Sequence, residues 1–158
     1  MKLPNLLNTY NQRTKSLDQG KRFLGIDYGS KRIGVAVSDP TNVIARGVGV
    51  VLNSRTAIAE IKKYASEFDV AAIVVGMPLT LKGTKGQKSV EVEEFIEKLK
   101  KEVAVEIATW DERFTSAQAH QTLLDMGVKK KQRQSKERID EMAAAIMLQA
   151  YLDSRKKN

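Results

Sequence analysis

The sequence predicts an α/β fold in which a five-stranded mixed sheet is covered by helices on both faces. Three stretches, Phe23 to Tyr28, Ile33 to Ser38 and about Val43 to Val51, follow one another across short turns, as in an antiparallel meander. Two later strand candidates, 71–75 and 103–109, are separated by a segment with helical spacing. The run 71–75 is apolar throughout, which is typical of a strand covered on both faces.

The strands of the meander end in residues that favour turns. Gly29 and Ser30 follow the first strand, and the segment 39–42 (DPTN) follows the second. The third strand leads into a helix that Asn53 or Ser54 can cap. That helix is predicted from apolar residues at helical spacing, namely Ile58, Ile61, Ala65 and Phe68.

The fourth strand ends at Gly76 and opens into a loop over 77–87. The loop holds a proline and two glycines, so we expect it to be irregular and mobile. It does not match a Walker phosphate loop, because Gly83 is followed five positions later by Lys88 instead of glycine. An amphipathic helix comes next, and the residues predicted to face the sheet are Val92, Phe95, Ile96 and Leu99.

The fifth strand, 103–109, delivers the polar block 110–113 (WDER) at its end. A Thr-Ser pair can then begin a helix over about 115–124, which stops near Gly127. A basic loop follows, and the last helix should run from about Ser135 to Leu152. Right-handed crossovers would leave strands one, four and five parallel, with their carboxyl ends on one edge of the sheet. We expect the functional site at that edge.

Length and composition favour one intracellular domain. The chain has 158 residues and no cysteine, which excludes disulfides, thiol nucleophiles and cysteine-based zinc sites. No apolar stretch reaches the length of a transmembrane helix. We expect a soluble, cytoplasmic protein with no membrane partner, a domain over 21–155, and a polar, flexible extension over 1–20.

The formal net charge of +8 is concentrated in two segments. Residues 1–22 carry five basic side chains and one acidic one, and residues 128–138 carry six and one. Such clustering is typical of a protein that binds a polyanion. We interpret the first segment as a solvated tail and the second as a nucleic-acid contact. The contact residues predicted there are Lys129, Lys130, Lys131, Arg133 and Lys136.

Carboxylates follow two of the parallel strands. Asp27 ends the first strand, and the pair Asp111-Glu112 ends the fifth, so the topology brings them to the same edge. Gly76, between them, leaves space that a long glutamate can cross. The simpler alternatives are that Gly76 is an ordinary turn residue and that the acidic pair only bonds Arg113.

A third carboxylate lies at the start of the last helix. The segment after Asp140 is apolar almost all round, so the helix should be buried, and a buried carboxylate needs a partner such as a metal ion. An acid near a helix start can instead simply complement the dipole. Periodicity does not decide between Asp140 and Glu141.

Four blocks in this order resemble the YqgF (RuvX) family of pre-16S ribosomal RNA nucleases, also called Holliday junction resolvase-like: FLGIDYGSKRIGVAVSD, VVGMPLTLKGTKGQ, WDERFTSAQA and KERIDEMAAAIMLQAYL. The match covers about Arg22 to Tyr151. The resemblance implies an RNase H-like fold and a divalent-metal nuclease site. The family's three acidic positions fall on Asp27, Glu112 and Asp140, and none is substituted.

The acids and the basic segments predict a nuclease that uses Mg2+ or Mn2+ on a phosphodiester, and the resemblance implies that its substrate is the 5′ end of pre-16S ribosomal RNA. Close to the scissile phosphate we expect Lys31, Arg32 and Arg113. Three alternatives stay open, namely a Holliday junction resolvase-like DNA endonuclease, a non-catalytic ribosomal RNA-binding assembly factor, and an actin-like ATPase, which the chain length disfavours. His120 and Trp110 are expected to pack instead of taking part in chemistry. The protein is expected to be a monomer or a homodimer.

Overall fold

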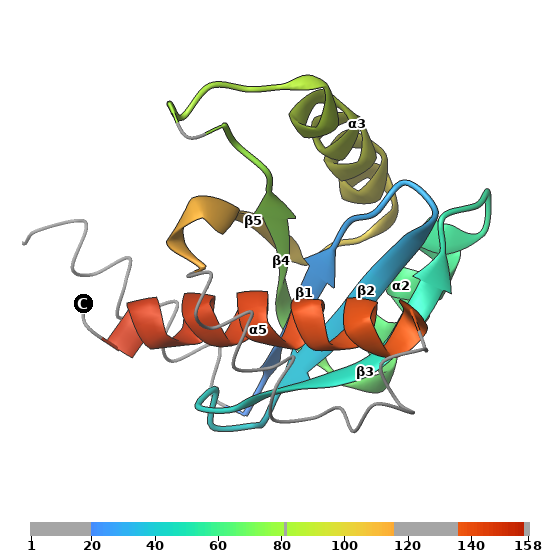
Figure 1. The fold of residues 1–158 in the computed structure, drawn as a ribbon. Coiled ribbons are helices and arrows are strands. Elements are labelled where there is room, and N and C mark those ends of the chain that lie inside the picture. The colour runs from blue at the N-terminus through green and yellow to red at the C-terminus, as the bar shows by residue number, and fades with distance from the viewer. Residues whose placement is uncertain (1–19, 81, 116–135, 157–158) are drawn as a thin grey trace, which may run out of the picture.

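The computed structural model describes residues 20–80, 82–115 and 136–156. A five-stranded sheet has the order β3-β2-β1-β4-β5, and long helix α5 lies across one face of it (Figure 1). The strands are β1 (Arg22–Asp27), β2 (Arg32–Ser38), β3 (Ala45–Leu52), β4 (Val70–Met77) and β5 (Glu106–Asp111). The α-helices within the described ranges are α2 (Ala57–Glu67), α3 (Gln87–Glu102) and α5 (Lys136–Lys156).

The pairing of the strands confirms the predicted topology. β1 pairs antiparallel with β2, which pairs antiparallel with β3. β1 pairs in parallel with β4, which pairs in parallel with β5. Strands one, four and five therefore end on one edge, as expected for right-handed crossovers.

Two cores form because side chains alternate across the sheet. Leu24 and Ile26 of β1 pack with Ile61 of α2 and Leu99 of α3 on one face. On the opposite face, Phe23 packs with α5 residues such as Leu148. The predicted sheet-facing residues of α3 are all buried, which confirms that the mixed sheet is covered on both sides.

Helix α5 approaches the sheet closely where the strands have glycine. A side chain at Gly34 of β2 would overlap the backbone oxygen of Asp140, and a Cβ at Gly25 of β1 would lie 2.8 Å from the Cβ of Leu148. Close approach of helix and strand leaves no room for water, so the apolar side of α5 is buried. These contacts fix the position of Asp140 beside β2.

Several predicted boundaries were wrong by a few residues. β5 begins at Glu106, because Val103 still donates its N–H to Leu99 at the end of α3. Neither predicted cap serves α2, which begins at Ala57, since the Asn53 amide instead donates to the carbonyl of Gly29 at 3.0 Å. Helix α5 continues four residues beyond the predicted end, to Lys156.

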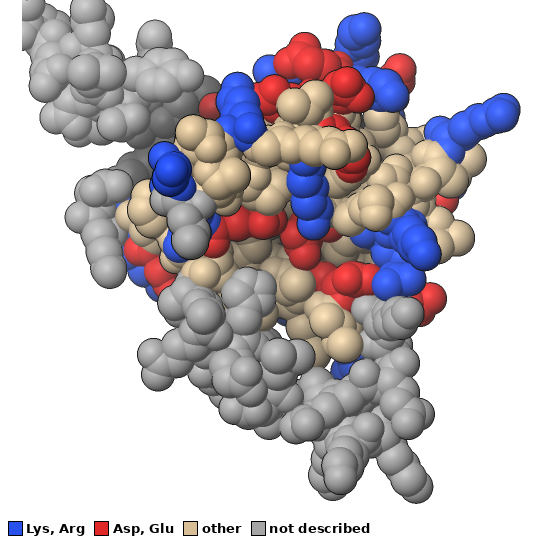
Figure 2. Space-filling model, turned by 45° about the horizontal axis from the view of Figure 1, so that its top comes forward, with Lys and Arg blue, Asp and Glu red and all other residues tan. Residues whose placement is uncertain are grey.

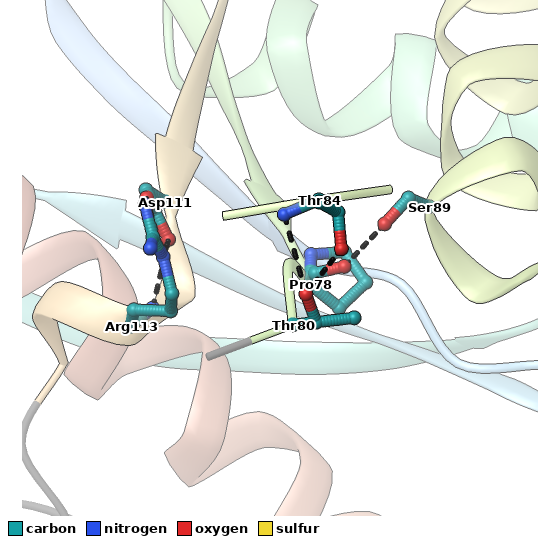
Figure 3. A network of polar contacts seen from close by, with 6 residues as sticks. All are labelled: Pro78, Thr80, Thr84, Ser89, Asp111 and Arg113. Carbon is teal, nitrogen blue, oxygen red and sulfur yellow. Dashed lines mark hydrogen bonds and ion pairs between the residues drawn. The ribbon is translucent and has the colours of Figure 1, made fainter. Parts of the chain in front are cut away.

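The loop after β4, predicted to be irregular, contains a closed turn. Leu79 and Lys85 form an isolated bridge, and the hydroxyls of Thr80 and Thr84 lie 2.6 Å apart (Figure 3). Ser89 of α3 donates to the carbonyl of Pro78, which ties the helix start to the end of β4. The turn is therefore held against the carboxyl edge of the sheet.

Apart from Thr115, which has extended backbone angles after η1 (Glu112–Phe114), the predicted helix over 115–124 lies outside the described residues, as do most of the basic loop, His120 and residues 1–19. No helix in the described ranges is both long and apolar enough to cross a bilayer.

Candidate active site

Asp27 ends β1 between two glycines. Its antiparallel partner on β2 is Gly34, and Gly76 of β4 follows the Ile26–Val75 pair of the parallel ladder. Because neither neighbour has a side chain, the two strands beside Asp27 leave room for side chains from elsewhere. That room is filled from β5 on one side and from α5 on the other.

Glu112 reaches Asp27 by crossing Gly76. It is the first residue of a short 3-10 helix, η1 (Glu112–Phe114), directly after β5. A Cβ added to Gly76 would lie 2.5 Å from the Glu112 Oε1 atom, so the glutamate extends over this glycine. The predicted crossing of the gap at Gly76 is therefore present in the structure.

Proximity to Glu112 changes the acidity of Asp27. Burial, followed by the charge of Glu112 and a hydrogen bond with it, raises the pKa of Asp27 from 3.8 to about 7. Asp140 acts in the same direction as the smallest contribution, and the positive charge of Lys88 lowers the pKa. The field at Asp27 is thus dominated by crowded negative charge.

Asp140 faces the same edge but is bonded to a cation. Its Oδ2 atom lies 2.8 Å from Nε of Arg32, the first residue of β2. The neighbouring acid, Glu141, extends instead over Gly47 of β3. Asp140 therefore lies beside β2 near Asp27, whereas Glu141 lies over β3.

The three predicted acids come to one edge of the sheet without converging on a single point. In the described part of the chain, no group of three or more acids or histidines is arranged to hold a metal ion as it stands. The reason is visible in the contacts, because Asp140 is turned toward Arg32 while Asp27 and Glu112 face one another.

The donor set nevertheless fits Mg2+ or Mn2+. These ions prefer carboxylate oxygens and keep much of their water, so a few carboxylates suffice. Asp27 and Glu112 lie side by side, and the pKa of Asp27 is raised to about 7. A divalent cation would neutralise the repulsion between their two negative charges. Rotation of the Asp140 side chain would supply a third ligand.

Asp111 and Glu112 have separate roles. Asp111 binds Arg113, whose Nη2 lies 2.5 Å from Oδ2 and whose Nε lies 2.9 Å from the same atom (Figure 3). The Arg113 guanidinium also lies against the turn after β4, since a Cβ on Gly83 would be 3.1 Å from Nη1. The alternative of an acidic pair bonded only to Arg113 holds for Asp111 but not for Glu112.

Acidic side chains lie near the middle of the face that Figure 2 shows, and basic side chains are interspersed with acidic ones around them. Lys31 is exposed in the turn between β1 and β2. Lys88, in the first turn of α3, acts electrostatically on Asp27 and was not among the predicted residues. Its position at the start of a helix, directly after the loop that follows β4, is the feature of the sequence that could have indicated it. Of the predicted basic loop, Lys136 begins α5, and the others lie outside the described residues.

Trp110 packs, as predicted. It contacts the cluster under α5, stands edge-on to Tyr151 with ring centroids 6.0 Å apart, and donates its Nε1–H to the Thr115 hydroxyl at 3.1 Å. Its position holds the end of β5 in place, directly before Glu112.

The sheet order and the helices on both faces of the sheet define an RNase H-like fold. Thermus thermophilus RuvC matches with a TM-score of 0.55 and 15% identity, over 86% of this chain and 96% of that one. The yeast mitochondrial Holliday junction resolvase Ydc2 matches with a TM-score of 0.54 and 11% identity, over 93% and 86%. At such identities the likeness concerns the fold alone.

A family model described as "RuvX: Holliday junction resolvase" matches residues 21–154, and the chain belongs to this family. A relative from Sulfurihydrogenibium is 43% identical over 134 residues, which cover 84% of this chain and 90% of that protein. Another, from Ruminiclostridium cellulolyticum, is 39% identical over 135 residues, or 84% and 94%. Both relatives carry the name "Putative pre-16S rRNA nuclease".

Proposed function

We propose that this protein is a metal-dependent nuclease that hydrolyses phosphodiester bonds in pre-16S ribosomal RNA. The observation that carries the proposal is the reach of Glu112 across Gly76 to the buried carboxyl of Asp27. The names of the relatives support this substrate. The absence of cysteine from the sequence agrees with work in the reducing cytoplasm.

Asp27, Glu112 and Asp140 would hold Mg2+ or Mn2+. When bound, the ion supplies Lewis acidity, which favours attack by water on phosphorus and stabilises the leaving oxygen. Gly76 and Gly34 keep the two glycine-lined sides of Asp27 open for the other two acids. The ends of β1 and β5 position Asp27 and Glu112 before substrate arrives, which reduces the entropic cost of assembling the site.

Basic side chains around the acids would bind the substrate backbone. Lys31, Arg32 and Lys88 lie at the carboxyl edge and would contact phosphates near the scissile bond. Arg113 would join them through the donors that its contact with Asp111 leaves free. The flanking backbone would be bound by the predicted basic loop, with Lys129, Lys130, Lys131, Arg133 and Lys136.

The proposal is tested by cleavage of matched substrates by the wild type and the Asp27→Asn variant. A labelled precursor RNA with the 5′ flank of 16S RNA and a four-way DNA junction would each be incubated with Mg2+, Mn2+ or EDTA. We expect metal-dependent cleavage of the RNA, reduced at least about 100-fold in Asp27→Asn. Glu141→Gln is the matched control, because it removes an acid one residue from Asp140 that lies over β3.

The other outcomes assign the alternatives. Cleavage of the junction but not of the RNA would make the protein a resolvase, the activity named in the description of the family model. Tight RNA binding without cleavage in either metal would favour a non-catalytic assembly factor. Equal cleavage by the wild type and Asp27→Asn would remove Asp27 from the site. Sedimentation of the same samples distinguishes monomer from homodimer.

A further inference from the structure

Arg32 and Asp140 form an ion pair at the edge of the proposed active site. They are 108 residues apart in the sequence, yet Nε and Oδ2 lie 2.8 Å apart. The side chains are 28% and 31% exposed, so the contact is partly shielded from water. Gly34, which contacts the Asp140 backbone, is the strand partner of Asp27, so the ion pair lies one strand away from the buried carboxyl.

The backbones of both residues are held, so only their side chains can exchange partners. Arg32 is paired within the β2–β3 ladder opposite Leu52. Asp140 is held by the close contact of α5 with Gly34. Asp140 is the one acid within the described residues that forms an ion pair with Arg32. If Asp140 turned away, Arg32 would present a planar group with several N–H donors, which suits a phosphate.

We propose that Arg32 exchanges partners when the site is loaded. In the metal-free protein it holds Asp140 away from Asp27 and Glu112. When a divalent cation is bound, Asp140 turns to the cation, and Arg32 is released to bind a substrate phosphate. This inference rests on the proposed function, because it takes Asp140 as a metal ligand and a phosphodiester as substrate.

The exchange couples the two binding events. Arg32 competes with the cation for Asp140, and a phosphate competes with Asp140 for Arg32. A nucleic acid should therefore increase the affinity for the cation, and the cation should increase the affinity for nucleic acid by the same factor. Arg32 is thus a positioning residue for Asp140 before it becomes a substrate contact.

The experiment measures Mn2+ affinity of the full chain without nucleic acid, from the electron paramagnetic resonance signal of free Mn2+. Removing the competing partner in Arg32→Gln should tighten Mn2+ binding by about 2- to 5-fold, the range expected for a partly exposed ion pair. Lys31→Gln is the charge-matched control. It removes a positive charge one residue away that forms no ion pair with Asp140 in the described part of the chain, and it should change the affinity less than about 2-fold.

A double-mutant cycle separates the exchange from a general effect of charge. In an Asp140→Asn background, Arg32→Gln should no longer change Mn2+ affinity. Persistence of the full effect in that background, or no tightening in Arg32→Gln alone, would overturn the exchange. Arg32→Lys keeps the charge but loses the Nε donor, and should tighten Mn2+ binding less, which provides a second variant if the glutamine protein folds poorly.

Arg32→Gln should have the opposite effect on the affinity for nucleic acid. In the presence of Mn2+, the Arg32→Gln protein should bind a short single-stranded RNA less tightly than the wild type does. In this variant, the RNA should also no longer increase the affinity for Mn2+. The failure of the proposed function looks different. In that case the wild type binds no Mn2+. If instead Asp140→Asn leaves Mn2+ affinity unchanged while Asp27→Asn abolishes binding, the exchange is overturned and the metal site at Asp27 stands.

Discussion

Single residues at the carboxyl edge show that this site is assembled at the expense of stability. Burial of Asp27 and, after it, the charge of Glu112 raise the pKa of Asp27 to about 7. Buried like charges persist where function needs them, because the rest of the fold offsets their cost. At the opposite end of the sheet, hydrogen bonds lower the pKa of Asp39, and its carboxylate stabilises the loop after β2.

For Asp27 we predict that the Asp27→Asn variant is more stable than the wild type at pH 8 in the absence of metal. A raised pKa means that the folded state binds its proton more tightly, so wild-type stability falls as pH rises from about 4 to 7. The free energy of unfolding of the variant should exceed that of the wild type by about 1–3 kcal/mol at pH 8, with little difference at pH 4. Urea unfolding in EDTA across this range is the measurement. Equal stability at pH 8 would contradict the crowding of Asp27.

Asp39 should show the opposite dependence on pH. It accepts N–H groups of Ile44 and Val43 at 2.8 Å and a bond from the Thr41 hydroxyl, which hold its pKa below the ordinary value. Asp39→Asn should therefore lower the free energy of unfolding at pH 7 by about 1 kcal/mol, since the loop is exposed to water. A depressed pKa stabilises only while the carboxyl is ionised, so the difference should shrink as pH falls from about 5 toward 2. A difference that is constant with pH would exclude this charge as its cause.

At the scale of elements, the two strands that flank β1 each have a glycine beside Asp27, and each glycine makes room for a different kind of group. Gly76 on β4 lies under the flexible end of the Glu112 side chain, whereas Gly34 on β2 lies under the backbone of α5. A flexible side chain can move away from a new methyl group, but a packed helix backbone cannot. The same substitution should thus have opposite consequences at the two positions.

Gly76→Ala should impair the proposed chemistry and spare the fold. The new Cβ would displace Glu112 Oε1 from above the strand, so we expect metal-dependent cleavage to fall at least about 10-fold. The midpoint of thermal unfolding should stay within about 2 °C, because only a side-chain end must move. Full activity in this variant would show that Glu112 reaches the site by another route.

Gly34→Ala should destabilise the whole fold. Its Cβ would overlap the Asp140 carbonyl oxygen, so α5 must shift from the sheet. We expect a loss of about 1–3 kcal/mol in the free energy of unfolding, typical of overpacking. Chemical denaturation of Gly34→Ala beside Gly76→Ala makes the comparison direct. Equal stability of the two variants would contradict the account of α5 docking.

At the scale of the whole molecule, basic side chains outnumber acidic ones, and the two kinds are interspersed on the face that Figure 2 shows. The net charge is +8, although the proposed chemical groups are carboxylates. The excess of basic side chains attracts a polyanion over a longer range than the acids at the carboxyl edge repel it. This attraction weakens as the salt concentration rises.

Salt dependence can locate the long-range attraction. Replacing Lys129, Lys130 and Lys131 with glutamine should reduce the slope of log affinity for single-stranded RNA against log salt concentration by about 2, at about 0.7 per lost phosphate contact. The slope is measured by fluorescence anisotropy at salt concentrations between about 50 and 300 mM. Replacing Lys63, Lys100 and Lys156 removes the same charge elsewhere. Equal slopes for the two triple variants would exclude the basic loop as a contact.

The order of strands and helices followed from local pattern alone. Apolar side chains recur every second residue in the strands and at helical spacing in the helices, so their spacing predicts the type of each element. The right-handedness of crossovers then leaves few possible topologies. The same pattern placed Asp27 at a strand end and left space at Gly76. Element boundaries were less accurate, because the end of α3 and the start of α2 depend on hydrogen bonds such as that from Asn53 to Gly29.

By itself, the sequence determined the architecture, the edge on which the acids gather and the family to which the chain belongs. Only the tertiary structure decided that Glu112 turns inward while Asp111 binds Arg113, that Asp140 instead of Glu141 faces the site, and that Arg32 holds Asp140. The physical reason is that side-chain direction depends on contacts between segments up to about a hundred residues apart, which neither propensity nor periodicity encodes.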